Sequence, residues 1–161
     1  MNLAIAVVLT FHVASGISDD AWIDHEVDVA KTRLDADFTR AAGSGALAET
    51  ITTVDDRDAL APLAANDGTV HVFVVAKLAD KDKDGGVIGG VTWPHGKRRY
   101  IIVSHDDARE DTLAHELGHY FGLPHTTDAH DLMTPLREPG GTLTDDQLAI
   151  VHKRIAAFTR R

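Results

Sequence analysis

The chain opens with an apolar run, Leu3–Val13, which is rich in branched side chains and is followed by Gly16. A run of this length and composition is typical of a buried β-strand. It is too short to span a bilayer. The alternative interpretation is a signal peptide with a small-residue exit at Ser15, but the basic residues that normally precede the apolar centre are missing. We therefore expect a strand.

The next apolar pattern has the period of a helix. Ser18 and Asp19 can begin this helix, and Gly43 can end it. Between them, hydrophobic residues recur at steps of three and four and so form one stripe. The stripe consists of Ile23, Val27, Ala30, Leu34, Phe38 and Ala41. We predict one long helix, packed on a sheet and ending near Gly43.

The middle of the chain contains four segments with the composition of strands. Apolar and β-branched residues dominate each of them, and turn residues separate them. A loop around Pro62 and Gly68 follows the first, and a turn at His95–Gly96 precedes the last. Glycines in the third indicate a bulge or a sheet edge. The predicted strands are Glu49–Val54, Thr69–Leu78, Gly86–Pro94 and Arg98–Ser104, with Thr69–Leu78 as a central strand.

Two more helices are predicted from capping patterns. Asp107 and Glu110 are spaced to begin the first. Thr144 and Gln147 form the same pattern before the last helix, whose buried face would be Leu148, Val151, Ile155 and Phe158. Strands and helices alternate early, and helices and loops follow. The order of elements predicts an α+β fold.

Composition narrows the class of protein. A chain of 161 residues without repeats or linkers is long enough for one domain and short for two, so we expect a single domain over residues 1–161. A net charge of −9 argues against nucleic acid and against an anionic membrane as partners. The chain has no cysteine, which excludes disulfides, thiolate zinc sites and a cysteine nucleophile.

The segment HELGHYFGLPH, His115–His125, contains the strongest candidate chemistry. His115 and His119 are four residues apart, so on a helix their imidazoles lie on one face, about 6 Å apart along the axis, and can reach one ion. Zinc accepts neutral imidazole nitrogen. Glu116 is placed to take a proton from a water molecule. The alternative is an amphipathic helix that happens to be rich in histidine.

A third ligand requires the helix to stop. Gly122 can adopt a left-handed conformation at the helix exit and turn the chain back. Pro124 discourages the helix from resuming. His125 would then reach the ion held by His115 and His119. This spacing predicts a zinc site with three histidines.

The segment His115–His125 resembles the extended zinc motif of the metzincin metallopeptidases. HDLMTP, with Met133, is similar to the methionine-containing turn that this family has beneath its metal. Leu9–Asp24 and Leu34–Phe38 look most like pappalysin-type members, whereas the compact Leu123–Pro135 is closer to matrixins, so no subfamily is assigned.

The resemblance implies a fold and a mode of binding. We expect a twisted, mostly parallel sheet with an antiparallel edge strand, a backing helix and an active-site helix. These elements would form an upper subdomain over about 1–122. A small lower subdomain over about 123–161 would hold the methionine turn and end in a helix. A peptide would lie along the edge strand, with Val87, Gly89, Gly90 and Val91 as candidate contacts.

Two departures from the family pattern stand out. Some metzincins place a tyrosine two residues after the turn methionine, where this chain has Pro135. Many matrixins are kept latent by a prodomain cysteine, a device that a chain without cysteine cannot supply itself. The roles of that tyrosine and that cysteine are therefore not carried over.

Other polar clusters have simpler interpretations. The loop Asp80–Gly86 resembles the start of a calcium loop but has Val91 where the final glutamate would stand, which favours a solvated acidic loop over a calcium site. Met133 would form an apolar floor under the histidines. For His130 an exposed loop position is expected. His12, His71 and His95 lack partners at ligand spacing, and core-edge or surface roles are expected for them.

The predicted function is that of a zinc endopeptidase. Zinc on His115, His119 and His125, with Glu116 as general base, would hydrolyse a peptide or protein substrate. A zinc-stabilised binding module without turnover and a zinc amidase acting on non-protein substrates are the alternatives. We expect a monomer. The compartment stays open, although secretion would suit a peptidase.

Overall fold

A computed structural model describes residues 6–45 and 47–160. Its centre is a five-stranded sheet with the strand order β2-β1-β4-β7-β6. The first four strands in that order run parallel, and β6 pairs antiparallel with β7 at one edge. Their bounds are β1 Val7–Val13, β2 Phe38–Ala42, β4 Val70–Val75, β6 Gly90–His95 and β7 Arg98–Ser104. This α+β architecture, including the antiparallel edge strand, confirms the predicted fold class.

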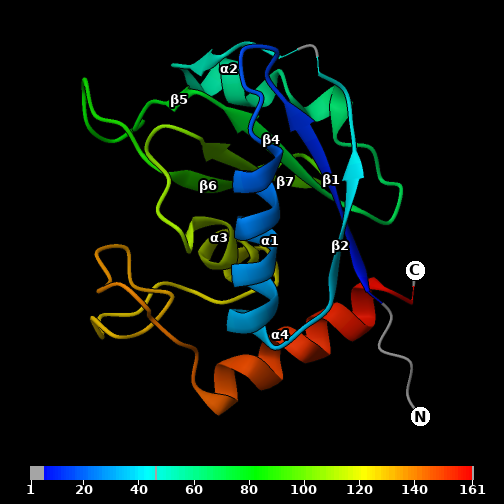
Figure 1. Cartoon of the computed structure of the whole chain (residues 1–161), viewed down its shortest axis with the longest axis vertical. Helices are drawn as coiled ribbons and strands as arrows, with labels where there is room; N and C mark the ends of the chain where they lie inside the picture. The colour runs from blue at the N-terminus through cyan, green and yellow to red at the C-terminus, as the bar shows by residue number, and fades with distance from the viewer. Residues whose placement is uncertain (1–5, 46, 161) are drawn as a thin grey trace.

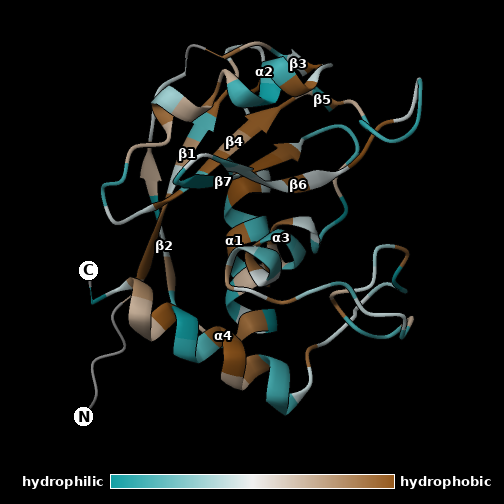
Figure 2. Cartoon of the chain, turned by 180° about the vertical axis from the view of Figure 1, so that it is seen from behind, coloured by the Kyte–Doolittle hydropathy of each residue, from teal (hydrophilic) through white to brown (hydrophobic). Residues whose placement is uncertain are grey.

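Helices α1 (Asp20–Leu34) and α3 (Thr112–Tyr120) pack together on one face of the sheet, and α4 (Asp145–Phe158) closes the lower end (Figure 1). The other face is covered by the short helix α2 (Val54–Asp58), a 3-10 turn at Ala61–Leu63, and a two-stranded sheet of β3 (Thr50–Ile51) and β5 (Lys77–Leu78). Hydrophobic residues are concentrated on the inner strands, and β6 is paler (Figure 2). The helix α3 packs against α1 and against the strands β6 and β7 at this edge of the sheet.

Strand β4 separates two hydrophobic cores. Val72 and Val74 face the helices, whereas Phe73 and Val75 face the opposite layer. Every residue of β4 is buried, as expected for a strand with parallel neighbours on both sides and layers on both faces. The prediction of a central strand here is confirmed.

The prediction of a helix ending near Gly43 is wrong. Helix α1 ends at Leu34, and the C-cap Asp35 has a left-handed backbone with φ 46°. Aspartate tolerates this conformation, which turns the chain back towards the sheet. Phe38 then begins β2, which pairs in parallel with β1. The spacing of Phe38 and Ala41 matched the helical stripe, but pairing with β1 decided the structure.

Three predicted strands have different limits. In Glu49–Val54 the strand is limited to Thr50–Ile51, because Thr53 caps α2 through a capping box with Asp56. The segment Thr69–Leu78 divides into β4 and β5 at Ala76. In Gly86–Pro94, β6 begins only at Gly90. The strand Arg98–Ser104 is confirmed over its whole length.

The two predicted helix caps had different outcomes. Asp107 does not cap α3; its Oδ2 accepts a hydrogen bond from Ser104 Oγ (3.1 Å), and α3 begins only after Asp111. The capping box of Thr144 and Gln147 before α4 is present.

The apolar run at the start of the chain forms a strand where it is described. Val7–Val13 is β1, whereas Leu3, Ala4 and Ile5 lie outside the described residues. Within the described part of the chain, the helices are too short or too polar to cross a membrane. The division into subdomains near residue 122 stays a prediction.

Candidate metal centre

Helix α3 brings His115 and His119 together. Their four-residue spacing places both rings on one face, with the two Nε2 atoms 3.1 Å apart. Two nitrogens bound to one tetrahedral zinc at 2.0–2.1 Å would lie about 3.3 Å apart. The separation therefore fits two ligands of one ion.

Backbone carbonyls orient both rings. His115 Nδ1 lies 2.6 Å from Leu132 O, and His119 Nδ1 lies 2.8 Å from Leu123 O. A carbonyl only accepts, so each Nδ1 carries the proton and each Nε2 keeps its lone pair. The two lone pairs then face each other, an arrangement that a cation between them stabilises.

The third histidine arrives through a turn at the end of α3. Gly122 has φ 100°, a conformation that side chains rarely adopt. Leu123 N–H donates to Gly118 O (2.9 Å), which closes the turn. One ligand nitrogen from each of His115, His119 and His125 then lies within 4.8 Å of the others. The predicted turn at Gly122 thus delivers His125 as the spacing indicated.

Burial keeps two of these rings neutral. It lowers the pKa of His115 to about 4, and the nearby positive charge of Arg137 acts in the same direction, while the hydrogen bond to Leu132 O opposes the shift. Burial also lowers the pKa of His119. Metal binding requires neutral imidazole, so both candidate ligands are in the form that a metal ion would bind at neutral pH.

Glu116 lies beside these ligands in a buried position. Thr92 of β6 contacts it, with Oγ1 2.9 Å from Glu116 Oε2 and 2.8 Å from Glu116 O. Burial raises the pKa of Glu116 to about 7, although the hydrogen bond from Thr92 opposes this shift. A carboxylate with a pKa near neutrality is well matched to taking up and returning a proton.

Met133 lies under the helix that bears the ligands. It is fully buried, and a Cβ atom added at Gly118 would lie 2.4 Å from its Sδ. Because Gly118 has no side chain, the thioether can approach the backbone of α3 between His115 and His119. The role of Met133 as an apolar floor under the histidines stays a prediction.

An ion pair fixes the chain after Met133 to the start of α3. Arg137 donates from Nε to Asp111 Oδ2 (2.9 Å) and from Nη2 to Asp111 Oδ1, and both side chains are buried. Arg137 Nη1 lies 3.3 Å from His115 Nδ1. The paired guanidinium thus places a positive charge beside His115, which disfavours protonation of its ring.

Glu26 of α1 supplies the cap that α3 lacks. Its Oε2 accepts from Leu113 N–H (3.0 Å), and its buried Oε1 has no hydrogen-bond partner among the described residues. Burial raises the pKa of Glu26 to about 7, opposed by the Leu113 hydrogen bond. The folded protein therefore binds this proton more tightly than the unfolded chain, so the contribution of Glu26 to stability falls as pH rises from about 4.5 to 7.

Replacing Glu26 with glutamine is expected to raise the free energy of unfolding at pH 8 by about 1–3 kcal/mol, with little or no gain at pH 5. Glutamine keeps an acceptor for Leu113 N–H but carries no charge. Urea unfolding across this pH range measures the effect, with Asp28→Asn on the exposed face of α1 as the control. Parallel stability curves for Glu26→Gln and the wild type would contradict the assignment.

The metal-binding candidates open into a cleft of about 810 Å³. Gly89, Gly90 and Val91 of the predicted substrate contacts line it, whereas Val87 does not and instead forms a bridge with Ala79. A Cβ atom at Gly90 would lie 2.8 Å from Thr112 Cγ2 and 3.0 Å from Glu116 Cγ. Glycine thus lets the edge strand approach α3 closely.

The remaining histidines and the acidic loop differ in their surroundings. His12 and His71, for which core-edge or surface roles were predicted, are both buried, and His12 Nε2 lies 2.9 Å from His71 Nδ1 across β1 and β4. His130 is exposed, as predicted. In the described part of the chain, one group of three or more potential metal ligands has its ligand atoms close together. It consists of the three histidines of the cleft. Calcium in the loop Asp80–Gly86 stays an untested alternative.

Sequence reasoning missed four residues of the centre. Thr92, Arg137 and Glu26 reach Glu116, His115 or the start of α3 from distant parts of the chain. Asp111 lies next to α3 in the sequence, but its partner Arg137 is 26 residues away. No spacing rule connects these contacts to the motif, so only the fold could reveal them.

A family model described as Matrixin matches residues 18–153, which include the three histidines, Glu116 and Met133. The chain belongs to the matrixin family. The resemblance to metzincins is thereby confirmed. Among curated proteins, no relative matches this matrixin.

Solved structures share the fold of this matrixin at low identity. Metalloproteinase-II from Bacteroides fragilis is 16% identical with a TM-score of 0.67; the alignment covers 94% of this chain and 53% of that one. The matrixin thus spans about half the length of that protein. Archaemetzincin from Methanopyrus kandleri is 14% identical with a TM-score of 0.63, and 94% and 96% of the two chains are covered.

A zinc-dependent peptidase from Methanocorpusculum labreanum is 16% identical with a TM-score of 0.54, and the alignment covers 92% of this matrixin and 99% of that chain. At these identities the likeness establishes the fold.

Proposed function

We propose that the protein is a zinc-dependent endopeptidase. The observation that supports this most directly is the convergence of three imidazoles beside a buried glutamate in an open cleft. The donor set is nitrogen only, at a spacing that suits zinc, and three protein ligands leave one coordination position free. Membership of the matrixin family supports the same reaction class.

The residues divide the work of hydrolysis between them. A zinc ion on His115, His119 and His125 would act as a Lewis acid towards water and the peptide carbonyl. Glu116 accepts the proton of the attacking water and then delivers it to the departing amine. Thr92 holds the carboxylate of Glu116 in place through its hydroxyl group.

The shape of the cleft favours cleavage within a chain. Strand β6 is the edge of the sheet, and Gly90 and Val91 of this strand line the cleft. An extended peptide can add to such an edge through main-chain hydrogen bonds. Binding along an edge does not require a free peptide terminus, so we infer an endopeptidase.

Removing the metal is expected to abolish peptide cleavage, and adding zinc is expected to restore it. A proteome-derived peptide mixture would be incubated with the untreated, chelator-treated and zinc-restored protein and analysed by mass spectrometry. Internal cuts in the first and third samples alone support the proposal. Cuts that persist in the zinc-free protein would overturn it.

The same experiment separates the alternatives. A binding module would make no zinc-dependent cut in any sample. A zinc amidase would hydrolyse small non-peptide amides but leave the peptide mixture intact. Cuts confined to peptide ends would replace the endopeptidase assignment with that of an exopeptidase.

A further inference from the structure

A second groove, of about 1010 Å³, adjoins the active-site cleft. Its walls come from the turn between β6 and β7, the end of α3, the chain before β4, and the C-terminal half of α4. Pro94 and Arg99 line both the groove and the cleft. A peptide that leaves the cleft along β6 can therefore continue into the groove.

Positive charge dominates this groove. Lys97, Arg98, Arg99 and Arg154 line it, together with one carboxylate, that of Asp67. Within residues 6–45 and 47–160, none of these four cations forms an ion pair with a carboxylate. This concentration is unusual for a chain with a net charge of −9.

The groove cations are held without being neutralised. Arg98 donates to Ala61 O, and Arg99 Nη1 donates to Tyr120 O at 3.0 Å. A carbonyl oxygen orients a guanidinium but leaves its net charge in place. Lys97 and Arg154 are exposed. Arg99 is exposed as well, so carbonyl oxygens orient two of the four cations and three of the four are exposed to solvent.

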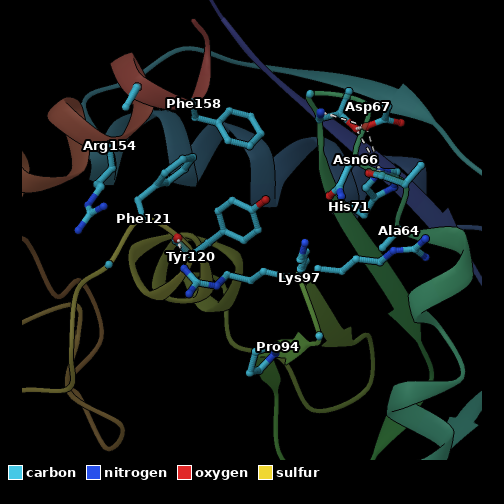
Figure 3. Close-up of a pocket in the computed structure, with 18 residues that line it drawn as sticks. Ala64, Asn66, Asp67, His71, Pro94, Lys97, Tyr120, Phe121, Arg154 and Phe158 are labelled. Carbon is cyan, nitrogen blue, oxygen red and sulfur yellow. Dashed lines mark hydrogen bonds and ion pairs between the residues drawn. The ribbon is translucent and has the colours of Figure 1, made fainter. Parts of the chain in front are cut away.

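An aromatic cluster forms the apolar part of the groove. Tyr120 and Phe121 have ring centroids 5.3 Å apart, and Phe158 lies 6.0 Å from each of them. Tyr120 and Phe158 are half-buried, so part of each ring faces the groove. These rings lie to one side of Lys97, with Asp67 on the other (Figure 3).

We propose that this groove binds an acidic segment of the peptide substrate, in which aspartate or glutamate side chains flank an aromatic or large aliphatic one. The acidic side chains would meet the four cations, and the apolar side chain would pack on the aromatic cluster. The volume suits several peptide residues rather than a single small anion. The overall negative charge of the protein disfavours a long polyanion such as nucleic acid.

This inference rests on the proposed peptidase function because the groove continues the active-site cleft. It assigns a substrate preference that is set outside the metal centre. Binding can nevertheless be measured separately from cleavage, so the two proposals can fail independently.

Binding would be measured by fluorescence anisotropy on the Glu116→Gln protein, which leaves the peptide intact. Two peptides that share one sequence differ only in a tail built around a phenylalanine. In the acidic peptide the phenylalanine is flanked by aspartate and glutamate, and in the neutral peptide it is flanked by asparagine and glutamine. Each tail is tested at either end. We expect the acidic peptide to bind about tenfold more tightly, with the advantage lost between about 0.05 and 0.5 M salt.

Lys97→Gln with Arg154→Gln is expected to remove this advantage. Among the described residues, neither side chain has a hydrogen-bond partner on which the fold depends. The control, Lys77→Gln with Lys153→Gln, makes the same charge change outside the groove and the cleft. It should preserve the tighter binding of the acidic peptide. Equal binding of the two peptides, an equal loss in both double variants, or tighter binding of single-stranded DNA would overturn the proposal.

Kinetics on the protein with Glu116 intact separate the two proposals. The acidic tail should lower KM and leave kcat unchanged, because it binds away from the reacting bond. Cleavage of both peptides with equal KM would overturn the groove and leave the peptidase standing. Groove-dependent binding without any cleavage would overturn the peptidase and leave the groove as a binding site.

Discussion

Replacing Glu116 with glutamine is expected to lower kcat by about 10³-fold while the protein keeps its zinc. Glutamine preserves the shape of the side chain and can still accept a hydrogen bond from Thr92, but it cannot take a proton from water. General-base catalysis is worth about 10²–10⁴ in rate. Steady-state cleavage of a peptide from the mixture, together with metal analysis of the same sample, measures both quantities.

The matched control for this change is Glu110→Gln. Glu110 is an exposed glutamate before α3 and does not line the cleft. The Glu110→Gln substitution should leave kcat unchanged. A Glu116→Gln protein that cleaves at the wild-type rate would show that another group moves the proton.

Replacing His125 with alanine is expected to reduce zinc affinity by more than about 100-fold and to abolish cleavage. Two imidazoles four residues apart would remain, and a catalytic zinc site needs three protein ligands. His125 is exposed, so its removal leaves the hydrophobic cores intact. Zinc content after dialysis against a weak chelator, together with thermal unfolding of the zinc-free proteins, tests this prediction.

His130→Ala is the control because His130 is an exposed histidine in the same loop. The His130→Ala protein should bind one zinc ion and retain activity. The ligand assignment would be wrong if His125→Ala held zinc as tightly as the wild type, or if His130→Ala lost it.

The three histidines of the candidate metal centre could be predicted from the sequence because their geometry is local. The spacing of His115 and His119 fixes one helical face, and Gly122 provides the turn that brings back His125 within six residues. Each step depends on backbone conformations that neighbouring residues dictate. The same holds for Arg98–Ser104 and for the capping box at Thr144.

The supporting contacts could not be predicted, because they join distant segments. Thr92 reaches Glu116 across 24 residues, and Glu26 reaches Leu113 across 87. A threonine in a strand and a glutamate in a helix are ordinary in sequence. The prediction of where α1 ends was wrong for a related reason. Phe38 continues the helical stripe, and only its pairing with β1 shows that it belongs to a strand.

The basic groove illustrates the limit of composition. A net charge of −9 argues against anionic partners when charge is averaged over the chain. Lys97, Arg98 and Arg99 are adjacent in the sequence, but Arg154 and the ring of Phe158 join them only through the packing of α4 against the end of α3. Local charge is a property of the folded surface.

The central claim is that one zinc ion is held by three imidazole rings, one of which is delivered by the turn at Gly122. X-ray absorption spectroscopy at the zinc edge of the metal-replete protein, compared with His125→Ala, tests it most directly. We expect three imidazole nitrogens at about 2.0–2.1 Å from zinc in the wild type and a changed ligand set in the variant. Absence of bound zinc, or an identical spectrum for the two proteins, would contradict it.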